Sequence, residues 1–462
     1  MASRSTLNAR NLEGLGAAKL AELLISLTQG NAAAKRQLRL ALAEQRGPAE
    51  IGREVRKRLA TIARSTSFLD WRQRDALLTD LDQQRLAIVG PIAEHEPTLA
   101  VDLLWTFLEL VEPLLERCDD SDGEMMQLFH QVTADLGCVA ARGEPDREAL
   151  ADQVYAALID NGYGQFDLLI EHLQEALGGQ GLAQLRQRLE AQRSRPNASE
   201  HRRRTVQLAM LEIADALGDA EAYLGEYRDH DPGALTVPAI VAEVAGRLTA
   251  AGRAEEALAQ LDAADPDQQG RLAGSIEWLD ARVAALEALE RGEEAQALRW
   301  MVVERSLSIR HLRAYLKHLP DFEDAAEEER ALDLALSYPG FNQALRFLHQ
   351  WPDRRRTARL ILERHDELDG DLYQLLGPVA EALEAKQPLA ATLCLRAMIN
   401  FSLEQGRSSR YRHAARHLQS CRALAAGIED WCGALDHAAY LAGLDQDHGR
   451  KLGFWSLVQP AL

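Results

Sequence analysis

The spacing of apolar residues constrains the fold of this chain more than any other feature. Val101, Leu104, Leu108, Val111 and Leu115 recur every three or four positions, and this spacing predicts a helix with one buried face. Aromatic residues make up only 5% of the chain and runs of β-branched residues are scarce, which disfavours sheets. We therefore predict an all-α fold. The same spacing is found at residues 20–27, 168–177, 206–217, 279–289 and 389–403.

Three glycines open similar phrases between helical stretches. The phrases LGDAEAYL, AGRAEEALAQL and RGEEAQALRW contain Gly218, Gly252 and Gly292, at spacings of 34 and 40 residues. Tetratricopeptide-type repeats have a period of ~34 residues and place a small residue at a tight turn. The phrases lack the aromatic and proline positions of the full repeat. Because one hairpin cannot bury its apolar face alone, we predict stacked antiparallel helical hairpins, a tetratricopeptide-like α-solenoid.

The apolar periodicity is interrupted at residues 193–205, which are rich in Arg and contain Pro196. This interruption predicts two domains. The first is an N-terminal helical domain with a basic first segment, residues 1–195, and the second is a C-terminal tetratricopeptide-like repeat domain, residues 200–462. A charged loop inside one continuous solenoid is the alternative interpretation.

Cysteine usage and hydropathy indicate the compartment. The five cysteines form no CxxC pair and leave one thiol unmatched, which suits a reducing environment. The apolar run at residues 21–27 is too short for the core of a signal peptide. The most apolar helix is interrupted by Asp102, Glu109 and Glu112, so it falls short of the ~20 apolar residues that a membrane span needs. We predict a cytoplasmic protein with no membrane partner.

Charge is distributed unevenly along the chain. A net charge of −19 argues against coating of nucleic acid or anionic membrane by the whole surface. Residues 1–64 nevertheless hold twelve Lys and Arg against five Glu and no Asp. On the helix predicted around Ile51, the residues Arg53, Arg56, Lys57 and Arg64 point away from the apolar face, a geometry that suits phosphate binding. A solvated face, or docking against the acidic remainder of the chain, is the other interpretation.

The last fifty residues combine cationic, histidine and aromatic side chains. The cations suit a carboxylate, a phosphate or an acidic partner peptide, and Trp455 adds a stacking surface. The alternative is that the rings close the last helix pair and the cations pair with carboxylates of the same chain. The candidate partner-binding residues are Arg410, Tyr411, His413, His417, His448, Arg450, Lys451 and Trp455.

A metal site is a further alternative for the C-terminal histidines. His413, His417 and Cys421 are spaced by four, so neighbouring pairs share a helix face. The axial rise from first to last is roughly 12 Å, so one zinc ion cannot bind all three. Cys432, His437 or His448 would have to complete the site. No phosphate loop and no GxSxG, HExxH or GxGxxG motif occurs, so we predict neither a cofactor nor a catalytic residue.

Four phrases carry a resemblance to a known family: LTDLD at 78–82, ALRW at 297–300, YLKHLPDF at 315–322 and the ending HGRKLGFW at 448–455. The chain resembles an uncharacterised family of bacterial, mostly proteobacterial, helical proteins over nearly its whole length. The ending is also similar to helical regions of some SWIM-type zinc-finger proteins. The finger's C-x-C and C-x-H are absent, so zinc-dependent nucleic-acid binding does not carry over. The resemblance implies a helical fold and no mechanism.

These observations together favour an interaction protein over an enzyme. Stacked helices leave a groove whose side chains vary without unfolding the core. We predict a cytoplasmic helical-repeat scaffold that binds a protein or peptide partner through its C-terminal segment. Nucleic-acid association through the basic N-terminal helices, and a metal-dependent enzyme that uses the C-terminal histidines, are the alternatives.

Overall fold

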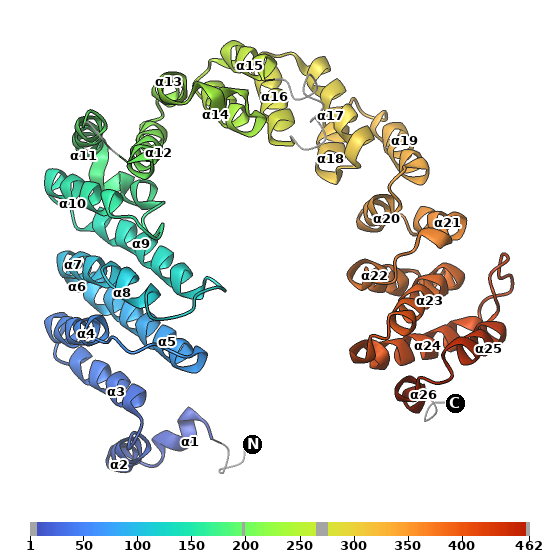
Figure 1. Ribbon diagram of the computed structural model, residues 1–462, viewed down its shortest axis with the longest axis horizontal. Coiled ribbons are helices and arrows are strands. Elements are labelled where there is room, and N and C mark those ends of the chain that lie inside the picture. The colour runs from blue at the N-terminus through green and yellow to red at the C-terminus, as the bar shows by residue number, and fades with distance from the viewer. Residues whose placement is uncertain (1–6, 196–198, 265–275, 459–462) are drawn as a thin grey trace. The chain divides into compact units, whose positions relative to one another are not determined.

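The computed structural model describes residues 7–195, 199–264 and 276–458 (Figure 1). Within these ranges all regular structure is helical, and strand-like pairing is limited to one isolated bridge between Leu69 and Cys118. The all-α prediction is therefore confirmed. The chain divides into two units, Met1–Leu235 and Thr236–Leu462. None of the described helices combines the length and the apolar character that crossing a membrane requires.

Unit 1 is a series of helices in which near neighbours along the chain pack together. The contacts run from α3 to α4, from α4 to α7, from α7 to α9 and from α9 to α11 (Figure 1). Its helices are α1 (Ala9–Glu13), α2 (Ala17–Leu27), α3 (Ala32–Glu44), α4 (Pro48–Ala63), α5 (Trp71–Ala87), the π-helical segment η1 (Ile88–Ile92), α6 (Ala93–His95), α7 (Pro97–Leu108), α8 (Val111–Leu115), α9 (Glu124–Arg142), α10 (Arg147–Ile159), α11 (Leu169–Arg193), α12 (Glu200–Ala216), α13 (Ala220–His230) and the 3₁₀ segment η2 (Pro232–Thr236), whose last residue begins unit 2.

Three of the five apolar residues predicted to form one buried face between residues 98 and 115 are buried, and Val101 and Leu115 are half-buried. The five lie on two helices instead of one. Leu104, Leu108 and Val111 are at most 2% exposed. Helix α7 ends at Leu108 and α8 begins at Val111. Pro113 explains the break, because a proline inside a helix lacks the N–H that would donate to the carbonyl four residues earlier and its ring clashes with that carbonyl. The sequence periodicity alone does not register this interruption.

The apolar face predicted at residues 20–27 is not buried. Helix α2 has no buried residue, and Leu27 is 73% exposed. The helix packs beside α1, which is only five residues long. Such a short helix is too small to cover the leucines of α2. The apolar spacing therefore predicts the helix correctly here. Burial of its leucines would require a larger neighbouring helix than α1.

Unit 2 continues the pattern of packing between successive helices. Contacts join α14 to α15 and α16, α17 to α18, α22 to α23, and α23 to α24. Its helices are α14 (Pro238–Ala250), α15 (Ala254–Ala263), α16 (Ile276–Ala288), α17 (Gly292–Ser306), α18 (Ile309–Lys317), α19 (Asp324–Ser337), α20 (Phe341–Gln350), α21 (Arg354–Glu363), the 3₁₀ segment η4 (His365–Glu367), α22 (Tyr373–Leu383), α23 (Pro388–Glu404), the 3₁₀ segment η5 (Ser408–Arg410), α24 (Tyr411–Ala425), α25 (His437–His448) and α26 (Leu452–Val458).

All three glycine phrases lie at helix ends that are closed by a left-handed residue, but at the third phrase this residue is not the predicted glycine. Gly218 and Gly252 are left-handed, with φ of 64° and 76°. At the third phrase the left-handed residue is not Gly292 but Glu290, which directly precedes the phrase and has a φ of 57°. A left-handed residue after a helix lets the next N–H donate to a carbonyl five residues earlier. The matching spacings are therefore 34 and 38 residues. The bonds are Asp219 N to Ala214 O at 2.8 Å, Arg253 N to Leu248 O at 2.8 Å and Arg291 N to Leu286 O at 2.9 Å.

The predicted domain boundary at residues 195–200 lies between α11 and α12, and residues 196–198 are outside the described part of the chain. Helices α11 and α12 pack against each other. The two units instead divide at 235/236. The position at which a separately stable domain ends thus stays a prediction.

Candidate functional site

The aromatic residues of the C-terminal segment attach the last helix to the unit. Phe454 is fully buried, and its ring meets the rings of Tyr411 and Trp455 edge-on, with centroids 6.1 and 5.2 Å apart. Trp455 donates its indole N–H to the carbonyl of His448 at 3.0 Å. These contacts join α26 to α24 and to the end of α25. They correspond to the alternative in which the rings close the last helix pair.

Two of the predicted cations also bind within the chain. Arg410 forms an ion pair with Asp371 at 2.7 Å, and its guanidinium lies 4.9 Å from the ring centre of Tyr373. Lys451 donates its ammonium N–H to the carbonyl of Leu403, at the end of α23. Of the eight predicted partner-binding residues, Arg410, Tyr411, Lys451 and Trp455 therefore have structural contacts.

The remaining four predicted residues do not form a metal site. His413 and Arg450 are exposed, whereas His417 and His448 are half-buried. Burial lowers the pKa of His417, and the nearby charges of His413 and Arg416 lower it further. In the described part of the chain, no three His, Cys, Asp or Glu side chains are placed to hold a metal ion. Whether these residues bind a partner stays a prediction.

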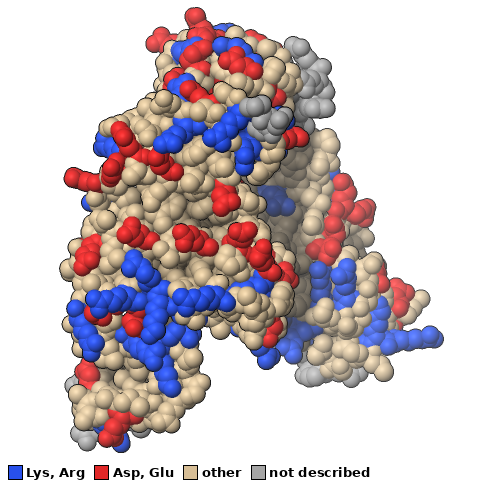
Figure 2. All heavy atoms as spheres, turned by 60° about the vertical axis from the view of Figure 1, so that its left-hand side comes forward, with Lys and Arg blue, Asp and Glu red and all other residues tan. Residues whose placement is uncertain are grey.

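Five basic side chains surround a cavity of about 250 Å³ on unit 1. Lys35, Arg36 and Arg39 come from α3, and Lys57 and Arg58 come from α4. We call these five residues the basic α3–α4 surface. Figure 2 shows Lys and Arg side chains gathered over the N-terminal helices. The cavity is completed by Ala32, Leu40, Glu54, Thr61 and Gln84.

A single buried carboxylate neutralises part of this charge. Asp80, on α5, is 4% exposed. It accepts hydrogen bonds from Nε of Arg58 at 2.8 Å and from Nε2 of Gln84 at 3.3 Å, and it pairs with Nη2 of Arg36 at 3.0 Å. One negative charge thus faces two guanidinium groups and fixes their positions. The pair of arginines keeps a net charge of about +1 against Asp80.

The other three cations of the surface have no acidic partner among the described residues. No ion pair forms at Lys35, Arg39 or Lys57, and all three are exposed. Arg36 Nε and Gln84 Oε1 are buried and make no hydrogen bond within the described chain. The three unpaired cations outnumber Glu54, the carboxylate in the cavity lining, so the surface keeps a net positive charge. This arrangement can hold a phosphate or another polar anion.

The residues predicted as the nucleic-acid alternative extend the same surface along α4. Arg53, Arg56, Lys57 and Arg64 are exposed. Arg53 pairs with Glu50 one turn earlier. Lys35, Arg36, Arg39 and Arg58 were not among the residues predicted from the sequence. Lys35, Arg36 and Arg39 are spaced by one and by four residues on a single helix, which the sequence shows. The sequence does not show that α3 packs beside α4.

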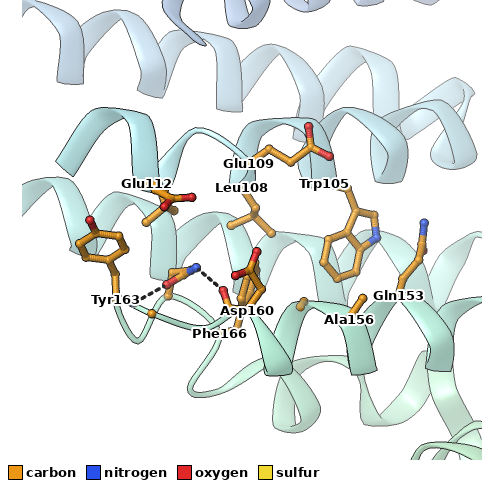
Figure 3. A pocket seen from close by; sticks show the side chains of 13 residues that line it. Trp105, Leu108, Glu109, Glu112, Gln153, Ala156, Asp160, Tyr163 and Phe166 are labelled. Atoms are coloured by element: carbon orange, nitrogen blue, oxygen red, sulfur yellow. Dashed lines mark hydrogen bonds between the residues drawn. The ribbon is translucent and has the colours of Figure 1, made fainter. Parts of the chain in front are cut away.

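A second cavity in unit 1 has the opposite character. Its volume is about 360 Å³, and Figure 3 shows Trp105, Tyr163 and Phe166 around it with Glu109, Glu112 and Asp160. The dashed bonds in the figure run from the backbone N–H of Tyr163 to the side-chain oxygen of Gln165, and from that side-chain amide to the carbonyl of Asp160. Rings with carboxylates suit a cation and repel an anion. The basic α3–α4 surface and this cavity therefore favour ligands of opposite charge.

The fold and the surface define a helical protein with a basic N-terminal surface. Residues 2–457 match the Family of unknown function (DUF6880), and the chain belongs to this family. The resemblance to an uncharacterised family is confirmed to that extent. No curated protein and no solved structure matches the chain.

Proposed function

We propose that this protein is a helical scaffold whose basic α3–α4 surface binds the phosphates of a nucleic acid. The observation that carries the proposal is the group of exposed cations Lys35, Arg39 and Lys57, which form no ion pair within the described residues and outnumber Glu54, a carboxylate that lines the same cavity. Backbone phosphates are the groups that such cations bind without a sequence motif. The proposal takes the nucleic-acid alternative as the function that the geometry favours.

The length of the surface supports a polymeric ligand over a single small anion. From residue 53 to residue 64, α4 advances about 16 Å. One strand of duplex carries a phosphate every 3.4 Å along its axis, so this distance corresponds to roughly five phosphates. Arg56, Lys57 and Arg64 have no ion-pair partner within the described residues. They are free to contact successive phosphates.

The net charge of −19 does not oppose this proposal. At physiological ionic strength the Debye length is ~8 Å, so exposed charges farther away are largely screened. The local excess of cations on α3 and α4 then decides whether a phosphate is attracted. Affinity is expected to be modest and strongly dependent on salt.

Fluorescence anisotropy with labelled single-stranded and duplex oligonucleotides tests the proposal. The variant Lys35→Glu/Arg39→Glu/Lys57→Glu changes three exposed residues and should weaken binding at least tenfold. The matched control, Arg412→Glu/Arg416→Glu/Arg450→Glu, makes the same change in net charge on unit 2 and should weaken binding less than about threefold. Equal losses in both variants, or no loss in the first, would overturn the proposal.

Our second candidate is the predicted protein or peptide partner of the C-terminal segment. The exposure of Arg412, His413, Arg416 and Arg450 favours it. The test is a pull-down with His413→Ala/Arg450→Ala, two changes that leave the structural contacts of Lys451 and Trp455 intact. An unchanged set of captured proteins would reject this surface. We further propose a tetratricopeptide-like arrangement of the hairpins and a cytoplasmic location, supported by the repeated left-handed turns and the five free cysteines.

A further inference from the structure

Arg396 is a buried arginine on α23, in unit 2, that is only partly satisfied. The residue is 5% exposed. Its Nη1 donates to the carbonyl of Leu435 at 2.6 Å. The guanidinium carbon lies 4.2 Å from the ring centre of Tyr440 and 4.8 Å from that of Trp431. The rings stabilise the cation, but they supply no acceptor in the plane of the guanidinium.

The other edge of this guanidinium has no acceptor. Nε and Nη2 of Arg396 are both buried, and neither donates a hydrogen bond to any described residue. These two nitrogens form one edge of the guanidinium, and their parallel N–H groups match the two oxygens of a carboxylate. Burial lowers the pKa of Arg396, yet an arginine side chain stays protonated in proteins. A buried cation with two unused donors is costly unless a ligand pairs with it.

Arg396 lines a cavity of about 570 Å³. Helix α23 contributes Arg396, Asn400 and Glu404, and the segment 433–435 and Tyr440 form another part of the wall. Tyr440 donates its hydroxyl to Asn400 Oδ1 at 2.7 Å, which fixes the ring that faces the guanidinium. Both nitrogens expose less than 1 Å² to water, so a ligand in the cavity reaches them only when neighbouring side chains of the wall move aside.

The other charged residues of this cavity decide what kind of anion fits. Asp366, Asp369 and Glu404 line it and are exposed, and Nε2 of His365, which also lines the cavity, lies 3.4 Å from Oδ1 of Asp366. Three carboxylates repel a phosphate dianion or a polyanion, and they attract an ammonium group. A ligand that satisfies both parts of the cavity carries one carboxylate and one cationic amine. The nucleic acid proposed for unit 1 does not meet this requirement.

We propose that the cavity binds a carboxylate-bearing ligand with a cationic amine, its carboxylate on the Nε–Nη2 edge of Arg396 and its amine near Asp369 and Glu404. A free basic amino acid and the C-terminal lysine or arginine of a peptide share this chemistry. The inference does not depend on the function proposed for the basic α3–α4 surface, because the two sites use residues of different units.

Isothermal titration calorimetry of the full chain tests the ligand class with four probes. L-lysine and N-acetyl-alanyl-lysine carry both groups, lysinamide lacks the carboxylate and acetate lacks the amine. At least one of the first two is expected to bind at submillimolar concentration, and lysinamide and acetate at least tenfold more weakly. Tighter binding of the peptide identifies a chain end as the ligand, and tighter binding of L-lysine identifies a free amino acid. Absence of binding for both, or equal binding of lysinamide, would overturn the proposal.

Two variants connect the binding to the proposed contacts. Arg396→Lys keeps the charge and removes the two-nitrogen edge, so it should weaken binding of the better probe at least tenfold. Glu404→Gln leaves Arg396 in place, so it tests the site even if Arg396→Lys does not fold. It should weaken binding of the same probe about fivefold. Glu381→Gln, on the exposed face of α22 and outside the cavity lining, is the matched control. Unchanged affinity in Glu404→Gln together with unchanged affinity in a folded Arg396→Lys would contradict the assignment.

Discussion

Asp80 accepts a hydrogen bond from Nε of Arg58 at 2.8 Å, between residues that are 22 positions apart in the chain. The contact joins α5 to α4 beneath the basic α3–α4 surface. Because Asp80 also pairs with Arg36, this one acid fixes two cations in place and leaves Lys35, Arg39 and Lys57 without an acidic partner among the described residues. The side chains of the ion-pair cluster around Asp80 are thus adjacent to the exposed cations of the basic α3–α4 surface.

Replacing Asp80 with Asn is expected to lower the free energy of unfolding by about 2–4 kcal/mol, because it leaves two partly buried guanidinium groups without their counter-charge. Urea denaturation measures the change. Asp75→Asn is the control, since Asp75 is exposed and pairs only weakly, at 3.4 Å, with Arg74. The same Asp80→Asn variant removes a negative charge under the surface, so oligonucleotide binding should tighten. A loss of stability below 0.5 kcal/mol, or weaker binding, would contradict this account.

Gly137 marks the closest approach between α9 and α11. A Cβ at this position would lie 2.2 Å from the carbonyl oxygen of His172, which belongs to helix backbone and cannot move aside easily. Gly137→Ala is therefore expected to destabilise unit 1 by about 2–3 kcal/mol. Gly225→Ala, on α13, meets nothing within 4 Å and should be neutral or stabilising by about 0.5–1 kcal/mol. Thermal unfolding of both variants distinguishes them, and similar melting temperatures would argue against the close approach.

Much of the fold was predictable from the sequence, because helix formation depends on local spacing. The buried residues between 98 and 115 followed from their periodicity. The break at Pro113 did not, because it depends on one missing backbone N–H, which the spacing of apolar residues does not show. The lack of burial in α2 was not predictable, since it depends on the size of the helix beside it.

The candidate sites were less predictable because they depend on which helices become neighbours. The cations of α4 were named from the sequence, whereas their junction with Lys35 and Arg39 required the packing of α3 on α4. Nothing local distinguishes Arg396 from an exposed arginine. Its buried environment depends on Trp431 and Tyr440, which lie 35 and 44 residues further along the chain.

Glu212 on α12 predicts a pH dependence of stability. Burial, reinforced by the nearby charges of Asp167, Glu171 and Asp215, raises the pKa of Glu212 from 4.5 to about 8. Between these two values the folded state keeps the proton while the unfolded state loses it. The stabilisation from this group is therefore complete below about pH 4.5, decreases as the pH rises and is lost above about pH 8.

Glu212→Gln removes this dependence, because glutamine stays neutral. The variant should be close to the wild type in stability at pH 5 and more stable by about 2–4 kcal/mol at pH 9. Denaturation at five pH values between 5 and 9 measures the difference. Parallel pH profiles for the two proteins would show that the carboxyl group is not the source.

Truncation distinguishes the two positions at which the chain can be divided. The first core cluster includes Val206, Ala209 and Ile213 of α12, and the second begins at Val303. A chain that ends at residue 235 keeps the first cluster whole and should unfold cooperatively. A chain that ends at residue 195 loses α12 and exposes the face of α11, so it should be markedly less stable. Equal stability of the two chains would instead support the boundary predicted at 195–200.

The salt dependence of oligonucleotide binding tests the central claim most directly. Lys35, Arg39, Arg56, Lys57 and Arg64 are the cations of α3 and α4 available for phosphates, so log K against log salt concentration should have a slope of about −3.5 for a single strand. In Lys35→Ala/Arg39→Ala/Lys57→Ala the slope should become shallower by about 2. A slope near zero for the wild type, or identical slopes for the two proteins, would show that phosphates do not bind at this surface.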